Sequence, residues 1–384
     1  MISFEKACSQ VLAEIRPVQE SVTLLVESAL GRVLSKPIMA TIDVPNHDNS
    51  AMDGYAVRSV DLAGTAEVSL RVSADLPAGE RLDRPLGEGE AVRIMTGAPI
   101  PDGSDCVVMQ ELARRVGDRV ILPPGRLLGE NIRPAGEDIR VGDEVLPKGC
   151  RLRPAHLGLL TSLGMAHVEV FRRPVVALLS TGNEVVEVGT SLVPGQVYDS
   201  NRSSLRAALT ALGVEVLDLG LVRDSKEEIM AALVRGGKEA DAIISTGGVS
   251  VGDYDLVKEV LLGQGEIRFW QVAMKPGKPQ AYGRLGRAHF FGLPGNPVSG
   301  LTVFLLIVRP ALLRMMGGLD EPPRHMRAKF RGKLNKKHSR MDFIRGVAHF
   351  DADGVWVETT GPQGSGILTS MARANVFIVL SESP

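Results

Sequence analysis

The chain has 384 residues, of which 44% are hydrophobic and 23% are charged, and its formal net charge at pH 7 is −1. This length predicts about two to four domains, and the composition is typical of a globular protein with apolar cores. A nearly neutral chain lacks the basic field that attracts a nucleic acid or an anionic membrane, and three cysteines without a CxxC pair exclude a disulfide framework and a cysteine-rich zinc site.

The N-terminal segment predicts a helix and no signal peptide. Apolar residues recur at helical spacing across residues 3–15, and Pro17 follows the predicted end of the helix. Acidic residues stand where a signal peptide would need an apolar core, so we expect a soluble cytoplasmic protein. A second apolar-periodic segment covers residues 23–34.

The residue composition of the sequence changes at Ile42. Through residue 141, short strand-like runs alternate with glycine and proline, which predicts a compact, mostly-β module. Residues 152–170 are again helical in pattern. We therefore predict that residues 42–141 form a mostly-β domain inserted into a discontinuous, elongated helical domain made of residues 1–41 and 142–171.

An alternation of strands and helices begins at Pro174. Strands are predicted at residues 175–179, 214–219, 242–245 and 267–272, and helices at residues 201–212, 226–235, 254–262 and 298–316. Gly213 would end the first of these helices, and Ser225 with Glu228 would cap the second. Residues 172–320 are therefore predicted to form an α/β domain with a doubly wound, mostly parallel sheet, whose ligands bind outside the carboxyl ends of the strands.

The C-terminal part of the chain predicts a further small domain. The longest apolar run, residues 303–308, is too short to span a bilayer, so no membrane association is expected. A proline-rich linker begins at Glu321, and short apolar runs follow it. Residues 321–384 are therefore predicted to form a small β barrel or sandwich.

A glycine loop follows the predicted strand at residues 242–245. Gly247 and Gly248 have no Cβ, so backbone N–H groups can turn toward an anion there. Ser250 adds a hydroxyl group, and Asp253 and Asp255 add the hard oxygen ligands that Mg²⁺ prefers. Taken alone, the stretch could also be a structural turn.

Two further loops at strand ends could bind an anion. Residues 275–279, KPGKP, hold the ammonium groups of Lys275 and Lys278 close together, which is unfavourable unless an anion lies between them. Residues 292–299, GLPGNPVS, enter a helix, and a helix N-terminus favours an anion. Each loop could be only a turn, but all three would share one rim of the sheet.

Carboxylates on the same rim could hold a magnesium ion. They are Glu184, Asp199, Asp224, Asp253 and Asp255. Mg²⁺ commonly bridges one or two carboxylates to substrate phosphates. Asp224 precedes Ser225 and could instead cap a helix.

A hydrolase is an alternative interpretation. Residues 248–252 match the G-x-S-x-G nucleophile elbow, with Ser250 as the nucleophile. None of the downstream histidines lies in a distinctive loop, and no HGGG-type segment lies upstream. The additional glycine before the elbow favours an anion-binding turn.

Six motifs occur in the order of a known family: NSAMDGYA from Asn49, MTGAP from Met95, STGNE from Ser180, TGGVSVG from Thr246, KPGKP from Lys275 and GLPGNP from Gly292. Together they resemble the molybdopterin molybdenumtransferases, which are related to the E domain of gephyrin. The resemblance covers almost the whole chain, and it implies the molybdopterin-binding fold for the α/β domain.

The resemblance implies an enzyme that takes adenylylated molybdopterin and molybdate. Such an enzyme inserts molybdenum into the dithiolene, with Mg²⁺, and releases AMP to give the molybdenum cofactor. It also implies a cytoplasmic homodimer of four-domain subunits, with an active cleft shared across the dimer. Contacts with the molybdopterin adenylyltransferase and with cofactor-receiving enzymes are expected.

Site residues follow from the resemblance at matching positions. Asp53, Thr96, Glu184, Asp224, Asp255 and Lys275 would be catalytic, and Glu184, Asp224 and Asp255 would also hold the metal. Molybdate would be held by Lys275, Lys278, Ser299, Arg345 and Ser365. Adenylylated molybdopterin would be bound by Gly247, Gly248, Ser250, Pro294, Asn296 and Pro297. Asp53 and Thr96, in the inserted domain, would face the cleft of the partner subunit.

Two related activities are the remaining alternatives. The small molybdopterin adenylyltransferases carry Gly-Gly-Thr-Gly where this chain has residues 247–250, GGVS, and they lack the flanking domains, which argues against adenylylation. A binding or scaffold role, which the relationship to gephyrin permits, is disfavoured because a scaffold does not need Asp224 and Asp255 together.

Overall fold

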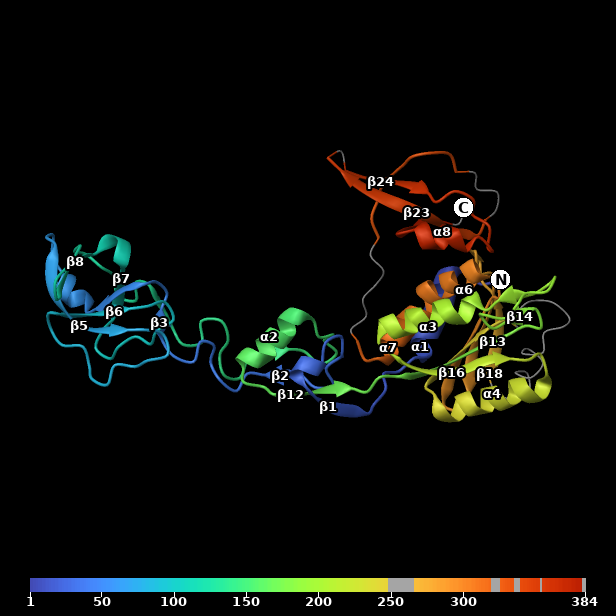
Figure 1. Ribbon diagram of the computed structural model, residues 1–384, viewed down its shortest axis with the longest axis horizontal. Coiled ribbons are helices and arrows are strands. Elements are labelled where there is room, and N and C mark those ends of the chain that lie inside the picture. The colour runs from blue at the N-terminus through green and yellow to red at the C-terminus, as the bar shows by residue number, and fades with distance from the viewer. Residues whose placement is uncertain (248–265, 319–324, 335–338, 353, 382–384) are drawn as a thin grey trace.

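The computed structural model describes residues 1–247, 266–318, 325–334, 339–352 and 354–381. Figure 1 shows an elongated chain: a β module lies at one end, a small middle module follows, and a larger α/β unit lies at the other end beside a C-terminal module. The predicted multidomain α/β architecture is confirmed.

The β module is built on a six-stranded sheet with the order β7-β4-β6-β5-β9-β8. Its strands are β4 (Gly54–Val57), β5 (Val68–Leu76), β6 (Glu90–Ile94), β7 (Cys106–Met109), β8 (Arg114–Val116) and β9 (Arg119–Leu122), and the short strands β3 (Asn49–Ser50) and β10 (Ile132–Arg133) pair with each other. Side chains alternate between the faces, so Tyr55 and Val57 enter one apolar cluster and Ala56 enters another. The sheet is therefore buried on both faces.

The middle module contains one helix and two pairs of strands. They are α2 (Pro154–Ser162), β1 (Ser21–Leu25) paired with β12 (His167–Phe171), and β2 (Ile38–Met39) paired with β11 (Glu144–Leu146). The helical prediction for residues 152–170 is correct only over α2. Residues 23–34 contain the end of β1, the 3₁₀ turn η1 (Val26–Ser28) and irregular chain instead of a helix. Gly164, at φ +73°, follows the end of α2, and the alternating Val168 and Val170 are then buried as a strand.

Helix α1 (Phe4–Glu14) forms as predicted, with Ser3 as its N-cap, but it packs in an unexpected place. Ala7, Val11 and Ile15 lie in the core of the α/β unit, whereas the prediction grouped residues 1–41 with the helical domain. The apolar stripe of a helix shows which face is buried, but not which surface covers it.

The central sheet of the α/β unit has the strand order β16-β13-β17-β21-β20-β18. The strands are β13 (Val175–Thr181), β16 (Glu215–Val222), β17 (Ala242–Thr246), β18 (Glu266–Gln271), β20 (Pro279–Leu285) and β21 (Ala288–Leu293). The first four strands in this order are parallel, and β20 is antiparallel to both of its neighbours. The mostly parallel sheet is confirmed, although the sequence prediction did not include β20 and β21.

Helices cover both faces of this sheet. α4 (Lys226–Glu239) packs on one face, and α3 (Ser200–Leu212) packs on the other with α1. α3 ends at Gly213 with φ +90°, and α4 begins at the N-cap Ser225, both as predicted. The predicted helix at residues 254–262 lies outside the described residues.

The last helix of the α/β unit runs from Pro297 to Met315 as α6 (Pro297–Val303), the π turn η4 (Phe304–Val308) and α7 (Arg309–Met315). It passes through Pro310, which has no N–H to donate, and the π turn precedes this residue. Among the residues that the structure describes, only this helix has the length and composition to cross a membrane. Of its most apolar 18-residue stretch, 61% is buried inside the molecule, which is typical of a core helix.

The C-terminal module is a five-stranded sheet that takes one strand from the α/β unit. It contains β22 (Lys329–Phe330), β23 (Met341–Asp351), β24 (Gly354–Thr359), β25 (Val376–Leu380) and helix α8 (Leu368–Arg373). Its fifth strand is β19 (Met274–Lys275), which pairs with β23 so that Lys275 lies opposite Asp342. The predicted lysine loop is therefore attached to both units.

Candidate functional site

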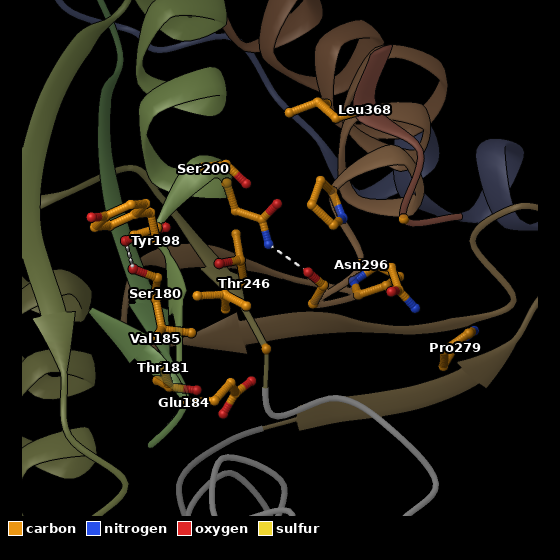
Figure 2. Close-up of a pocket in the computed structure, with 18 residues that line it drawn as sticks. Ser180, Thr181, Glu184, Val185, Tyr198, Ser200, Thr246, Pro279, Asn296 and Leu368 are labelled. Atoms are coloured by element: carbon orange, nitrogen blue, oxygen red, sulfur yellow. Dashed lines mark hydrogen bonds between the residues drawn. The ribbon is translucent and has the colours of Figure 1, made fainter. Parts of the chain in front are cut away.

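A cavity of about 740 Å³ lies at the carboxyl ends of the central parallel strands. Its walls come from the loop after β13, the short strands β14 (Val185–Val186) and β15 (Val197–Tyr198), the start of α3, the end of β17 and the loop before α6. Gly366 and Leu368 of the C-terminal module complete the lining, and Figure 2 shows these residues around the cavity. The location agrees with the expected edge of the sheet.

Hydroxyl groups and two helix starts characterise the lining. The hydroxyl-bearing residues are Ser180, Thr181, Tyr198, Ser200 and Thr246. Both α3 and α6 begin at the wall of the cavity, where helix dipoles favour an anion. Asn201 Nδ2 donates to the Gly295 carbonyl at 2.7 Å (dashed in Figure 2), and this bond links the two helix starts.

Asp199 is a buried carboxylate with a structural role. One of its oxygens accepts the backbone N–H of Arg202 at 3.0 Å and thereby caps α3. The other accepts hydrogen bonds from Ser180 Oγ and from Arg202 Nε. This rim carboxylate is therefore occupied by protein donors and fixes the position of Ser180 in the cavity wall.

Arg202 joins three carboxylates from three segments. Besides Asp199, it bonds Asp218 of β16 at 3.2 Å and Glu187 at 2.5 Å. Burial lowers the pKa of Arg202, but the bonds to Asp199 and Asp218 outweigh it, and the net shift is upward. The guanidinium is consequently a permanent cation that holds the start of α3 against the sheet.

Two of the predicted metal ligands flank one loop. Glu184 is exposed and lines the cavity, and Asp224 accepts the backbone N–H of Asn183 at 3.0 Å. The alternative that Asp224 caps α4 is wrong, because Ser225 is the N-cap. The third predicted ligand, Asp255, lies outside the described residues. Within the described part of the chain, no group of three His, Cys, Asp or Glu residues could hold a metal ion.

Gly247 lines the cavity in a conformation that requires glycine. Its φ is +87°, and a Cβ would lie 2.6 Å from the carbonyl oxygen of Thr181. The predicted partners Gly248 and Ser250 lie outside the described residues, as does the G-x-S-x-G elbow of the hydrolase interpretation.

The lysine loop lies next to the cavity through Pro279, which is part of the lining. Lys275 and Lys278 are both exposed. On the protein side of the loop, the buried Gln280 Nε2 donates to the Gly277 carbonyl at 2.7 Å and holds the turn in place. The structure thus presents two ammonium groups on a supported loop, but neither lysine lines the cavity in this chain.

Of the third loop, Pro294, Asn296 and Pro297 line the cavity as predicted. Ser299 does not, because it lies inside α6 and is only 5% exposed. Ser365 reaches the same helix through its backbone, since its carbonyl accepts the N–H of Val298 at 3.2 Å.

Arg345 is a buried residue of β23 that organises the loop beside the cavity. It is 2% exposed, and burial lowers its pKa. Its Nε donates to Ser370 Oγ at 3.1 Å, and its Nη2 donates to the Gly364 carbonyl at 3.2 Å. These bonds fix the segment that contributes Gly366 and Leu368, so the structure assigns Arg345 contacts within its own module.

Asp53 and Thr96 are close to each other but far from the cavity. Asp53 Oδ1 accepts the backbone N–H of Thr96 at 2.7 Å and its hydroxyl at 2.8 Å. These bonds, the backbone bond first, hold the pKa of Asp53 below its usual value. Both residues belong to the β module at the opposite end of the molecule in Figure 1.

Several lining residues were missed by the sequence prediction. Tyr198 comes from the end of β15, Ser200 and Asn201 come from the start of α3, and Gly366 and Leu368 come from the C-terminal module. The N-cap character of Asp199 was a usable signal for the first three, because it places a helix start at the rim. No local signal marks the other two.

Three family models match successive parts of the chain. They are described as "MoeA N-terminal region (domain I and II)", matching residues 2–164, "Probable molybdopterin binding domain", matching residues 177–314, and "MoeA C-terminal region (domain IV)", matching residues 327–383.

Similar proteins cover the full length. The molybdopterin molybdenumtransferase of Haemophilus influenzae is 41% identical over 388 aligned residues, covering 100% of this chain and 95% of the relative. The relative of the same name from Nostoc sp. is 38% identical, with coverages of 92% and 83%. Two structures of the molybdopterin biosynthesis MoeA protein from Pyrococcus horikoshii match with TM-scores of 0.87 and 0.83 at 28% and 34% identity, covering 100% of this chain and 96% and 95% of theirs.

Proposed function

The chain belongs to the molybdopterin molybdenumtransferase family and inserts molybdenum into molybdopterin during biosynthesis of the molybdenum cofactor, and we propose that its substrates are adenylylated molybdopterin and molybdate. AMP is the second product of the proposed reaction. The observation that supports this proposal is the cavity of about 740 Å³ at the carboxyl ends of the central strands.

The cavity suits the adenylylated substrate by its chemistry. The hydroxyl groups of Thr181, Ser200 and Thr246 can donate to phosphate oxygens, and the two helix starts favour the negative charge of a pyrophosphate linkage. Gly247 lets the loop after β17 approach the Thr181 carbonyl, where a Cβ would clash, and this close packing shapes the cavity wall. We assign Pro294, Asn296 and Pro297, together with Gly248 and Ser250, to the same substrate.

Mg²⁺ is proposed as the cofactor. Glu184 and Asp224 supply hard oxygen donors around one loop, which fits the ligand preference of this ion, and Asp255 is proposed as the third ligand. Bound there, Mg²⁺ would neutralise charge on the phosphoanhydride. The same carboxylates are proposed to orient the water that cleaves the adenylate.

Molybdate is proposed to bind at the lysine loop. A tetrahedral dianion is stabilised by ammonium groups, and Lys275 and Lys278 are exposed on a turn that Gln280 supports. Because β19 pairs with β23, the loop lies between the α/β unit and the C-terminal module. Ser299, Arg345 and Ser365 are proposed to bind molybdate together with the two lysines.

A homodimer is proposed because Asp53 and Thr96 lie far from the cavity of their own chain. In a dimer, the β module of one subunit can bring this pair to the cavity of its partner. We further propose a cytoplasmic enzyme that contacts the molybdopterin adenylyltransferase and the enzymes that receive the cofactor.

Turnover measured as AMP release tests the proposed function. AMP should form from adenylylated molybdopterin only when both molybdate and Mg²⁺ are present, and Lys275→Ala should abolish it. Lys238→Ala, which removes an exposed lysine from α4, is the matched control and should leave turnover unchanged. Unaltered turnover in Lys275→Ala would place the anion site elsewhere, and pterin binding without molybdate-dependent turnover would instead support the scaffold role.

A further inference from the structure

A second cavity, of about 430 Å³, lies at the opposite edge of the central sheet. Val175 and Glu215, the first residues of β13 and β16, form one side of it. Val22 of β1 and Arg32 of the middle module form another. Since the candidate active site lies at the carboxyl ends of the same strands, the sheet separates the two cavities. Figure 1 shows the paired β1 and β12 leading from the middle module toward the α/β unit at this edge.

Arginine dominates the lining of this second cavity. Arg32, Arg172, Arg173 and Arg287 line it, together with the glutamates Glu20 and Glu215. The four arginines come from the middle module, the segment before β13 and the turn between β20 and β21. The lining therefore carries four guanidinium groups against two carboxylates.

One of the four arginines is already neutralised. Arg172 forms a bidentate pair with Asp241, at 2.7 and 2.8 Å, and also bonds Glu20 at 3.2 Å. The same Asp241 carboxylate accepts the N–H of Val175 at 2.8 Å. Arg172 is the ion-pair partner of Asp241, and the charge of Arg287 contributes more weakly to lowering the pKa of this carboxylate.

The other three arginines have no carboxylate within ion-pair distance in the part of the chain that the structure describes. Arg32 is half-buried, and its Nη2 donates to the Phe171 carbonyl at 2.7 Å, which fixes its position. Burial first, and the nearby charge of Arg173 second, lower the pKa of Arg32. Like charges at one cavity destabilise each other, and an anion between them would relieve this.

We propose that this cavity binds a phosphate-class oxyanion, held by Arg32 from the middle module and by Arg173 and Arg287 from the α/β unit. The planar guanidinium fork matches the oxygens of a tetrahedral oxyanion and can bind them bidentately. Because its ligands belong to both units, the bound anion links the middle module to the central sheet. The bound anion also stabilises the folded chain.

Titration of inorganic phosphate into the full-length chain, at constant ionic strength, tests the proposal. Calorimetry should give a saturable site, and phosphate should raise the melting temperature. Arg287→Gln should weaken the Kd about tenfold, the loss expected for one charge-assisted hydrogen bond. Arg173→Gln, at a second exposed position, should do the same. Lys238→Gln removes one charge from the same unit outside the cavity and should leave the Kd unchanged.

A second control separates this site from the candidate active site. Asn296→Ala alters the lining of the large cavity and should leave the phosphate affinity of the arginine cavity intact. The proposal is overturned if the wild-type chain does not bind phosphate. It is equally overturned if Asn296→Ala removes the binding while both arginine variants, shown to be folded by their melting curves without phosphate, bind like Lys238→Gln.

Discussion

Arg202 Nε donates a hydrogen bond to Asp199 Oδ2 at 3.0 Å, and Ser180 Oγ donates to the same oxygen. Through this shared oxygen, an arginine that does not line the cavity determines where a lining hydroxyl lies. The contact also holds the N-cap of α3, so the helix start and the end of β13 are fixed together.

Replacing Arg202 should therefore disturb both stability and the cavity. In Arg202→Met the buried Asp199 carboxylate loses its cation, and the free energy of unfolding should fall by about 3 kcal/mol. Urea denaturation measures this loss. Arg206→Met is the matched control: its partner is also Asp218, but its side chain is 64% exposed, so its loss should cost less than about 1 kcal/mol. Equal losses in the two variants would contradict the structural role of Arg202.

Gly247→Ala should impair the cavity more than a change at an unconstrained glycine. Gly189 has a similar φ, +94°, but no atom lies within 4 Å of its ideal Cβ position. Gly189→Ala should thus cost only the backbone strain, about 1 kcal/mol. Gly247→Ala adds a clash with the Thr181 carbonyl, so its unfolding free energy and its turnover should both fall further. If thermal melting and turnover were the same in both alanine variants, the close approach at Gly247 would have no consequence.

His289 should make the stability of the fold depend on pH. It is 6% exposed and bonded to Tyr282 Oη at 3.2 Å, and burial lowers its pKa from 6.5 to about 4. The unfolded chain binds this proton more readily, so the stabilising contribution is complete above pH 6.5 and is lost as the pH falls toward 4. The loss should approach about 3 kcal/mol. Denaturation curves of His289→Gln should lack this pH-dependent component, and an unchanged pH profile would exclude His289 as its source.

The proposed shared cleft can be tested by mixing inactive subunits. Asp53→Asn and Lys275→Ala should each abolish turnover in a homodimer. In a mixed dimer, one cleft would carry both substitutions and the other would carry neither, so random mixing should restore about a quarter of the wild-type activity. AMP release after joint refolding is the readout. Absence of any recovery, with mixed dimers demonstrated by tag pull-down, would mean that each cleft takes Asp53 and Lys275 from the same subunit.

The amino-acid sequence by itself determined the α/β class, the alternating order of strands and helices, and the three glycine- and proline-rich loops that border the cavity. These features are local, because β-branched runs, N-caps such as Ser225 and C′ glycines such as Gly213 act over a few residues. Gly247 and Pro294 were found in the same way, since glycine and proline mark turns at strand ends.

Only the tertiary structure decided what these local features contact. It placed α1 in the core of the α/β unit, joined the Lys275 loop to the C-terminal sheet and brought Leu368 to the cavity. It also gave Asp199 and Arg345 protein partners where the sequence offered a free carboxylate and a free guanidinium. Burial and pairing depend on segments far apart in the chain, and periodicity within one segment cannot show which distant surface will cover it.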